Sequence, residues 1–339
     1  MFNIETNLIF LLFLLTFIIA FLFTPYWIKR ARECGIVGKD MNKYGHPDVV
    51  EMGGITIIFA FILISLFYIS IQTFILQPDA EIQIKILTII STILIVTLIG
   101  VFDDGIGWKI GLKQWEKPLL VIPATIPMVV INAGNSMMVI PFLGALGAVD
   151  FGLLYPLVIV PLGIIGAANG YNMLAGHNGL EAGLGVIILS FMGSIVWVSD
   201  IYWLSIITFI MVGALLAFLV YNWYPAKVFP GDTLTYSIGT FIAIVAILGN
   251  LEKIAVILFI PFFLEFLLKV RYKFKTENFC VPDKDNKLAL PDNKIYSLCH
   301  IALAFLLRID KKHATEKNIV FVIYGFELIL ICFCLLFVL

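Results

Sequence analysis

The chain has 339 residues, of which 61% are hydrophobic and 13% are charged, and its formal net charge is −1. A typical soluble protein has about 25% charged residues, so this composition excludes an ordinary soluble domain and indicates a membrane protein. The small net charge hides a strong asymmetry in where the basic residues lie. No nucleic-acid partner is expected.

Ten apolar segments are candidate transmembrane helices, since about 20 mostly apolar residues cross the hydrocarbon core of a bilayer. The segment near residue 125 is the weakest, because Pro123 and Pro127 interrupt it, although proline is tolerated where neighbours satisfy the freed backbone groups. The short glycine-rich run 137–148 is interpreted as an outer loop or a re-entrant piece. The predicted fold is an all-α polytopic membrane protein with about ten spans, over 7–27, 53–76, 84–102, 118–133, 151–168, 179–198, 202–221, 233–249, 251–269 and 318–338.

The basic residues predict an orientation. Lys and Arg are enriched in cytoplasmic loops, and of the 22 in this chain only Lys85 and Lys253 lie outside one alternate set of connections. We therefore predict that both termini lie outside and that the catalytic loops face the cytoplasm. The connections with basic residues are 28–52, 103–117, 222–232 and 269–317.

A single integral membrane domain is predicted over 1–339, with 270–317 as a larger cytoplasmic loop before the last helix. The sequence shows no obvious repeat, low-complexity run or flexible linker. The first apolar segment is too long for the core of a signal peptide and is interpreted as a span. The five cysteines have no zinc-binding spacing and are expected to be free thiols.

Two adjacent carboxylates, Asp103 and Asp104, end the third apolar segment. They repel each other unless a cation or a proton compensates, and at a helix C-terminus they also oppose the helix dipole. Phosphate or metal chemistry is therefore favoured over a solvated helix end. Lys117 would lie at the N-terminus of a helix beginning at Pro118, which favours it as a phosphate ligand. Lys113 is the weaker candidate, because it could instead reach lipid headgroups.

The most specific stretch begins at Asn169. Asn169 and Asn172 are three residues apart and share one helical face, which favours ligand or metal contacts, with an interhelical hydrogen-bonded clamp as the alternative. Gly176 and Gly179 lie on either side of Asn178 in a predicted turn, where the backbone can approach a ligand closely.

Asp232 follows a Pro230-Gly231 turn at the start of the eighth apolar segment. It is a natural helix N-cap, but the turn faces the same compartment as Asn172, which favours a functional role. Oxygen ligands together with retained waters suit Mg²⁺, so Asp232 and the amide oxygen of Asn172 are a chemically sensible pair. His177 alone is a weak sign of function, and a surface position is an equally good interpretation.

The first and last inner loops are less specific. The first, from Gly38 to Glu51, mixes donors and acceptors suited to a nucleotide. The last contains basic residues that are mostly expected to be surface charge, namely Lys273, Lys275, His300, Arg308 and His313.

These motifs, in this order, resemble the polyprenyl-phosphate N-acetylhexosamine-1-phosphate transferase family over almost the whole chain. The resemblance is closest to the branch that makes dolichyl diphosphate N-acetylglucosamine, the first step of N-glycan assembly. The diagnostic runs are KDMNK at 39–43 followed by Glu51, FDD at 102–104, NGYNMLAGHNGLEAG at 169–183 and FPGDT at 229–233. Together they are highly specific, whereas a lone pair of aspartates would not be.

The resemblance implies roles for individual residues. Asn172 and Asp232 are implied as ligands of Mg²⁺, with Mn²⁺ as an alternative, and Asp103 and Asp104 as the catalytic acidic pair. Lys117, subject to its alignment against Lys113, is implied as the ligand of the lipid phosphate. Substrate contacts are expected from Lys39, Asp40, Met41, Glu51, Asn169 and Asn178, with Glu51 and Asn178 near the uracil. The basic cluster that grips the diphosphate in the family has no clean counterpart, and its candidates are Lys273, Lys275 and His313.

The function implied is transfer of N-acetylglucosamine-1-phosphate from UDP-N-acetylglucosamine to a dolichyl-type polyprenyl phosphate in the bilayer. The absence of consecutive histidines in the last loop argues against a muramoyl-pentapeptide substrate. The short loop favours an archaeal enzyme in the cell membrane over a eukaryotic one in the endoplasmic reticulum. A homodimer through outward-facing apolar helices is a further option.

Two alternatives stay open. One is the same reaction on undecaprenyl phosphate, for cell-wall or O-antigen precursors. The other is a secondary transporter, which would need polar sites near the bilayer midplane. Glu265 and Glu327 are the main acids within the predicted spans.

Overall fold

The computed structural model describes residues 2–106, 113, 115–139 and 148–338, and helices dominate it. The α-helices are α1 (Phe2–Glu33), α2 (Gly54–Phe74), α3 (Ala80–Ile106), α4 (Glu116–Val130), α5 (Val160–Met173), α6 (Leu180–Val198), α7 (Tyr202–Asn222), α8 (Gly231–Gly249), α9 (Glu252–Leu258), α10 (Ile260–Arg271), α11 (Leu298–Ile309) and α12 (Glu316–Phe337). A π-helical segment, η2 (Tyr155–Ile159), leads into α5, and two 3₁₀ turns are η3 (Pro291–Asn293) and η4 (Lys311–His313). Three antiparallel two-stranded hairpins pair β1 (Val37–Lys39) with β2 (Asp48–Val50), β3 (Met137–Val139) with β4 (Ala148–Asp150), and β5 (Val281–Pro282) with β6 (Leu288–Ala289).

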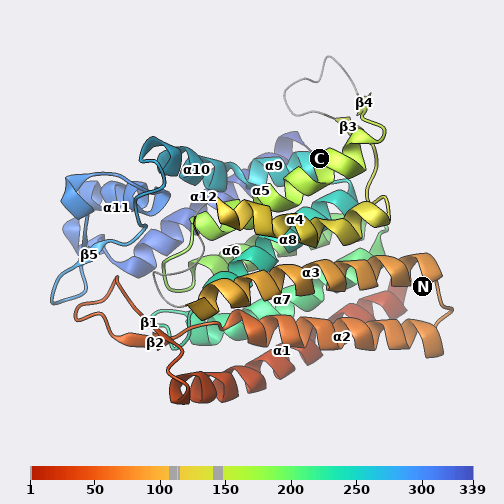
Figure 1. The fold of residues 1–339 in the computed structure, drawn as a ribbon, viewed down its shortest axis with the longest axis horizontal. Helices are drawn as coiled ribbons and strands as arrows, with labels where there is room; N and C mark the ends of the chain where they lie inside the picture. Colours follow the sequence, from red (N-terminus) through yellow and green to blue (C-terminus); the bar gives the residue numbers. More distant parts are fainter. Residues whose placement is uncertain (1, 107–112, 114, 140–147, 339) are drawn as a thin grey trace.

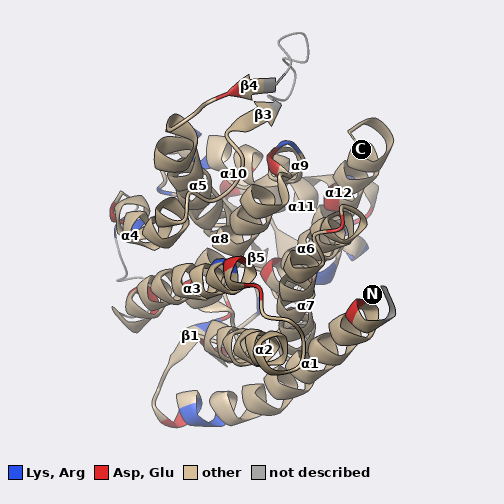
Figure 2. Ribbon diagram, turned by 90° about the vertical axis from the view of Figure 1, so that its right-hand side faces the viewer, with Lys and Arg blue, Asp and Glu red and all other residues tan. Residues whose placement is uncertain are grey.

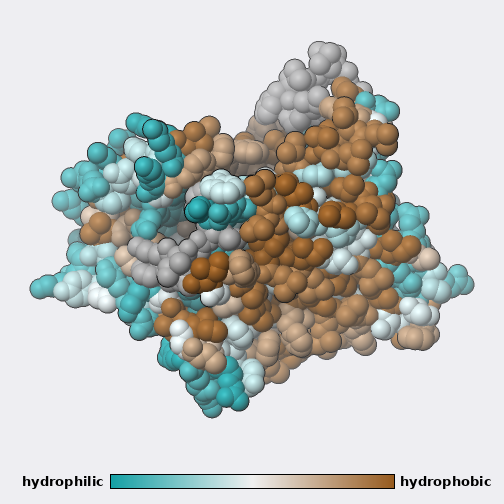
Figure 3. Space-filling model, in the orientation of Figure 1, coloured by the Kyte–Doolittle hydropathy of each residue, from teal (hydrophilic) through white to brown (hydrophobic). Residues whose placement is uncertain are grey.

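Eight of the described helices are long and apolar enough to cross a membrane. They are α1, α2, α3, the continuous helix formed by η2 and α5, α6, α7, α8 and α12. Exposed apolar side chains spread over the middle of the molecule, with hydrophilic side chains toward its two ends (Figure 3). Such an arrangement suits a bilayer, whose core leaves no partner for exposed polar groups. The chain is therefore an all-α polytopic integral membrane protein, as predicted.

The count of ten spans is not confirmed, because two predicted spans are not continuous helices of spanning length. The predicted span 251–269 is divided into α9 and α10 at Phe259. Pro261 follows the break and has no N–H to donate to the carbonyl of Ile257, so the helix cannot continue unchanged. The predicted span 118–133 corresponds to α4, which has only 15 residues and contains both prolines noted above.

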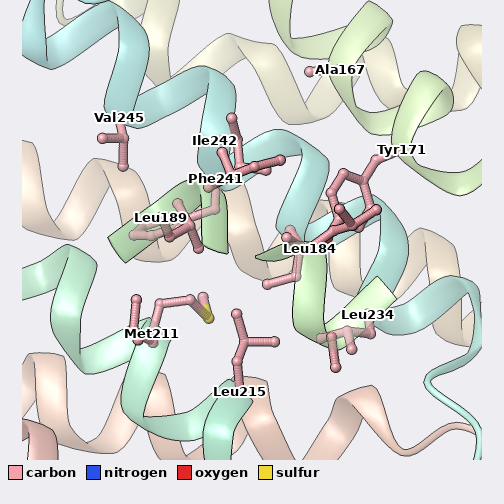
Figure 4. Close-up of a cluster of buried hydrophobic side chains, with 14 of the residues drawn as sticks. Ala167, Tyr171, Leu184, Leu189, Met211, Leu215, Leu234, Phe241, Ile242 and Val245 are labelled. Atoms are coloured by element: carbon pink, nitrogen blue, oxygen red, sulfur yellow. The ribbon is translucent and has the colours of Figure 1, made fainter. Parts of the chain in front are cut away.

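Helix α8 lies at the centre of the bundle and packs against α2, α3, α5 and α6. Glycines allow close approach of its backbone to two neighbours. A Cβ atom on Gly100 of α3 would lie 2.6 Å from Thr233 Cα, and one on Gly239 of α8 would lie 2.3 Å from the Ala167 carbonyl oxygen of α5. Phe241 and Ile242 of α8 belong to a core of buried aliphatic and aromatic side chains (Figure 4). Tight packing of α8 fixes where its N-terminus lies relative to the ends of α3 and α5.

The hairpin β1–β2, helix α11 and strand β5 lie at one end of the bundle, on the left in Figure 1, and the hairpin β3–β4 lies at the other. Both termini lie toward the β3–β4 end. Charged residues concentrate near the ends of helices and in the connections (Figure 2). Which end faces the cytoplasm stays a prediction. Residues 140–147 of the predicted outer run, and residues 107–112 and 114 of the predicted 103–117 loop, lie outside the described residues.

Candidate active site

A cavity of about 490 Å³ opens at the end of the bundle that carries the β1–β2 hairpin. It is bordered by the C-terminal ends of α3 and α5, the N-terminal ends of α4 and α8, and the segment that follows α10. Helix ends that are remote in sequence therefore meet around one space. Nine of the predicted site residues line it: Lys39, Asp40, Met41, Glu51, Asp103, Asp104, Lys117, Asn172 and Asp232.

Lys117 joins two carboxylates that come from different helices. Its Nζ lies 2.7 Å from Asp103 Oδ2 and 2.8 Å from Asp232 Oδ2. Asp103 is buried, while Lys117 and Asp232 are partly accessible from the cavity. One ammonium group thus compensates two carboxylates that would otherwise repel each other. A charged ligand in the cavity can therefore contact Lys117 and Asp232 directly.

Asp104 binds the N-terminus of α8 instead of pointing to Lys117. Its Oδ1 accepts a hydrogen bond from the Asp232 N–H at 2.8 Å, and its Oδ2 accepts from the N–H and the hydroxyl of Thr233 at 3.0 and 2.6 Å. The N-cap alternative considered for Asp232 is wrong, because α8 begins at Gly231 and Asp232 lies in its first turn. The carboxylate that caps this helix comes from α3, where it also meets the positive end of the α8 dipole.

Gly231 makes that arrangement sterically feasible. Its φ is +71°, a conformation that favours glycine. A Cβ atom at this position would lie 2.4 Å from Asp104 Oδ2. The Pro-Gly-Asp sequence therefore serves the approach of one carboxylate as well as the turn itself.

Asn169 and Asn172 share a helical face but differ in their surroundings. Asn172 lies in the last turn of α5, lines the cavity and accepts a hydrogen bond from the Thr235 hydroxyl at 2.9 Å through Oδ1. Asn169 is buried one turn earlier and donates to the Ile165 carbonyl at 2.8 Å. It is not among the residues that border the cavity.

The oxygen donors at this end suit a divalent cation that is completed by a substrate. Within the described ranges there is no group of three or more His, Cys, Asp or Glu side chains that could hold a metal ion. Asp232 and Asn172 nevertheless present a carboxylate and an amide oxygen to the same cavity. Mg²⁺ is usually bound through one or two carboxylates plus waters and substrate phosphates, so these residues fit such an ion.

Glu51 lies beside the acidic pair and is held in a restricted space. Burial, with the nearby charge of Asp104, raises the pKa of Glu51 to about 7. A Cβ atom on Gly38 would lie 2.0 Å from Glu51 Oε1, so a side chain there would displace this carboxyl. Lys39, which also borders the cavity, is half exposed and forms an ion pair with Asp48 at 2.5 Å.

Asn178 is not among the residues that border the cavity and is part of a buried network around Lys43, so its substrate contact stays a prediction. Lys43 Nζ lies 3.0 Å from Asp40 Oδ2 and 3.3 Å from Asn178 Oδ1, and it also pairs with Glu316. The ammonium groups of Lys43 and Lys317 lie 4.2 and 4.9 Å from the centre of the Tyr224 ring. Lys43 belongs to the KDMNK run, but no separate role was predicted for it; its spacing of three residues from Asp40 was the available signal.

The candidates for gripping the diphosphate do not reach the cavity. Lys273, Lys275 and His313 are exposed and do not border it. Lys113 is likewise exposed, with Glu116 Oε1 at 3.8 Å from its Nζ, so the preference for Lys117 agrees with the geometry.

Lys269, which was not predicted, borders the cavity from the last turn of α10. Its Nζ donates to the Thr276 carbonyl at 2.8 Å, contacts Asn278, and lies 3.5 Å from Glu265 Oε1. Asn278 in turn donates to the carbonyls of Met173 and Ala175, both at 2.7 Å. Lys269 therefore joins the segment after α10 to the end of α5. It was overlooked because it ends an apolar run.

Comparison with known proteins bears directly on this geometry. Residues 86–250 match the model of glycosyl transferase family 4. A protein of Saccharolobus solfataricus is 34% identical over 318 residues, which is 93% of this chain and 92% of the relative. It carries the provisional name UDP-N-acetylglucosamine–dolichyl-phosphate N-acetylglucosaminephosphotransferase. The chain belongs to glycosyl transferase family 4.

Two further relatives carry names with different substrates. A phospho-N-acetylmuramoyl-pentapeptide-transferase of Halalkalibacterium halodurans is 32% identical, covering 72% of this chain and 76% of the relative. A UDP-N-acetylglucosamine–dolichyl-phosphate N-acetylglucosaminephosphotransferase of Dictyostelium discoideum is 29% identical, covering 70% and 65%. As a family member the chain is a sugar-phosphate transferase, and the family depends on a divalent metal. The family resemblance seen in the motifs is confirmed.

The family match contains 15 of the 25 residues that border the cavity. Asp103, Lys117, Asn172 and Asp232 lie inside the matched range, whereas the 39–41 run, Glu51 and the lining residues from Lys269 onward lie outside it. The charged cluster thus belongs to the part that the family model describes.

Proposed function

We propose that this enzyme transfers N-acetylglucosamine-1-phosphate from UDP-N-acetylglucosamine to a dolichyl-type polyprenyl phosphate, which releases UMP and forms a lipid-diphosphate sugar, the first step of N-glycan assembly. The observation that carries the proposal is the Asp103–Lys117–Asp232 cluster, which borders one cavity together with Asn172 and the 39–41 run. The names of the relatives from Saccharolobus solfataricus and Dictyostelium discoideum support this pair of substrates.

Phosphoryl transfer depends mainly on positioning and charge neutralisation. Asp232 and Asn172 would hold Mg²⁺, with Mn²⁺ as an alternative, and the ion supplies neutralisation of the diphosphate charge when bound. Lys117 offsets the charge of the incoming lipid phosphate, and Asp103 keeps its ammonium group in place. Asp104 orients the first turn of α8 and so fixes Asp232.

The lipid phosphate oxygen attacks the β-phosphorus, the bond from that phosphorus to the UMP oxygen breaks, and UMP leaves with the electron pair. A phosphomonoester has a second pKa of about 6, so the nucleophile is largely ionised near neutral pH. A strong general base is unnecessary, and Asp103 can take a residual proton.

A two-step route through an aspartyl-phosphate is less favoured. Both oxygens of Asp104 are engaged by α8, and Asp103 is paired with Lys117. Radiolabelled sugar phosphate trapped on the protein would reverse this preference.

The substrate-bearing end would face the cytoplasm, in the cell membrane of an archaeon or the endoplasmic reticulum of a eukaryote. The polyprenyl phosphate would reach it from the bilayer. A single domain over 1–339 and a homodimer stay predictions.

A secondary transporter is disfavoured for two reasons. The chain belongs to a transferase family, and the carboxylate of Glu265 is already engaged by Lys269 and by the Leu298 N–H at 2.7 Å.

The deciding experiment measures UMP release by purified protein in detergent with UDP-N-acetylglucosamine, dolichyl phosphate and Mg²⁺. Asp232→Ala should abolish it, whereas the matched control Asp285→Ala, on an exposed loop that does not border the cavity, should not. Undecaprenyl phosphate in competition tests the lipid. No UMP with either lipid from a folded sample would refute the proposal.

A further inference from the structure

The turn between α5 and α6 is held in place from both sides of His177. The Gly176 N–H donates to Glu181 Oε1 at 2.6 Å, and the Gly176 carbonyl accepts from Asn42 Nδ2 at 2.8 Å. Gly176 has φ +134°, and a Cβ atom there would lie 3.3 Å from the Phe279 ring, so the position favours glycine. The residue before His177 therefore has little freedom to move.

The residue after His177 is fixed equally firmly. The Asn178 N–H donates to Glu316 Oε1 at 2.7 Å, and its Nδ2 donates to Asp40 Oδ2 at 3.2 Å. Its Oδ1 accepts from the Ala226 N–H at 2.7 Å and faces Lys43. The Asn178 carbonyl oxygen thus has two partners inside the protein and its amide nitrogen has one, so this side chain is held firmly in place.

His177 differs from both neighbours. It is 2% exposed, so the alternative of a surface histidine is wrong, and it borders the cavity. Its Nδ1 is buried and has no hydrogen-bond partner within the part of the chain that the structure describes, and its Nε2 has a contact only with Cys280 Sγ, at 4.0 Å. Buried polar groups are rarely left unsatisfied, because each costs free energy.

We propose that His177 is a specificity-determining residue of the nucleotide-sugar site, and that its ring turns on substrate binding so that the unsatisfied Nδ1 forms a hydrogen bond with an uncharged polar group of the bound nucleoside. The inference rests on the proposed function and deepens it. Asn42 lies in the 39–43 run and holds the carbonyl of Gly176, so the His177 turn is tied directly to the segment whose Asp40 and Met41 border the same cavity.

The charge state of His177 agrees with a nucleoside contact. Burial, followed by the nearby His300 and the charge of Lys43, lowers the pKa of His177 to about 3. A neutral imidazole is a hydrogen-bonding group and offers no positive charge to a diphosphate. Positive charge at the cavity comes instead from Lys39, Lys117 and Lys269.

The test compares His177→Leu and His177→Asn with the unmodified protein, by thermal melting in detergent with and without UMP. His177→Leu should melt at the same or a higher temperature without ligand, because it removes an unsatisfied nitrogen and only the weak, 4.0 Å contact of Nε2 with Cys280 Sγ. Its dissociation constant for UMP should rise about three- to tenfold, the usual effect of one neutral hydrogen bond. His177→Asn should restore part of the affinity, because an amide atom can take the place of Nδ1.

Kinetics give a second readout. The KM for UDP-N-acetylglucosamine should rise by the same factor as the dissociation constant for UMP, while the KM for dolichyl phosphate stays unchanged. His46→Asn is the matched control, because His46 is exposed and does not border the cavity. If the leucine variant does not fold, His177→Met removes the ring nitrogens with a flexible side chain.

The outcomes separate the two proposals. If the unmodified protein is not stabilised by UMP, the proposed function fails and this inference fails with it. If UMP stabilises the unmodified protein and the leucine or methionine variant binds UMP equally well, the inference alone is overturned. A lower melting temperature without ligand, with unchanged affinity for UMP, would show that His177 is structural.

Discussion

The carboxylate of Asp104 accepts hydrogen bonds from both the backbone N–H and the hydroxyl of Thr233, at 3.0 and 2.6 Å. Its neighbour Asp103 instead forms an ion pair with Lys117. Two adjacent aspartates that form one motif in sequence therefore have separate tasks. One stabilises a helix terminus, and the other belongs to the charged cluster.

Substituting the two aspartates should separate these tasks. Asp104→Ala removes the three hydrogen bonds that this carboxylate accepts at the start of α8, and loss of a cap costs about 0.5–2 kcal/mol. The variant should melt at a lower temperature and lose activity. Asp103→Ala should lose activity with a smaller change in melting, because Lys117 keeps Asp232 as a partner. Equal melting temperatures for the two variants would contradict this division.

The lysines that follow α3 offer a direct comparison of a buried and an exposed ammonium group. Lys117→Met should lower the rate of UMP release by about 100-fold or more, as expected for removal of a group that neutralises charge in the reacting site. Lys113→Met should retain most activity, because 73% of its side chain is exposed. Initial rates at saturating substrates provide the measurement. Similar losses in both variants would mean that Lys113 also reaches the substrate.

Gly231 should tolerate no side chain. Gly231→Ala imposes a positive φ on alanine and places a Cβ atom 2.4 Å from Asp104 Oδ2. We expect a loss of stability of about 1–3 kcal/mol, together with reduced activity, because the first turn of α8 must shift. Gly163→Ala in α5 is the control, since a Cβ atom there meets nothing within 4 Å. Thermal melting of both variants decides the matter, and an unshifted Gly231→Ala would refute the steric argument.

Stability should depend on pH through Glu51. Its pKa is raised from 4.5 to about 7 by burial and by Asp104, so the folded state holds a proton that the unfolded chain releases. The stabilising contribution of that proton is full below pH 4.5 and is lost as the pH rises through 7. Glu51→Gln should therefore melt at a higher temperature than the unmodified protein at pH 8 and at a similar temperature at pH 5. The same difference at both pH values would show that ionisation of Glu51 is not the cause.

Much of the charged cluster could be predicted from the sequence, because alternate connections between spans must lie at the same end of a bundle. That rule predicts that Asp103, Lys117, Asn172 and Asp232 lie at the same end of the bundle. It gives no information on which side chain of a motif reaches the shared space. Asn169 and Asn172 have the same helical face, yet only Asn172 lies in the last turn, where α5 reaches the cavity.

The remaining differences depend on contacts between distant segments. Lys43 and Glu316 are far apart in sequence, and neither lies in a pattern that indicates the other. Lys269 and Glu265 belong to an apolar run and were interpreted as part of a span. The break at Phe259 was missed because composition does not reveal how a proline two residues later alters backbone hydrogen bonding.

The pairing of Lys43 with Glu316 also has a consequence for the order of biosynthesis. Glu316 opens α12, which emerges from the ribosome after α1–α11, whereas Lys43 and Asp40 emerge soon after α1. Until α12 is inserted, the ammonium group lacks one of its two carboxylates and Asn178 lacks the acceptor for its N–H. The network that holds Asp40, which borders the cavity, would therefore be completed only at the end of translation, and partly made chains would lack this support on one side of the cavity.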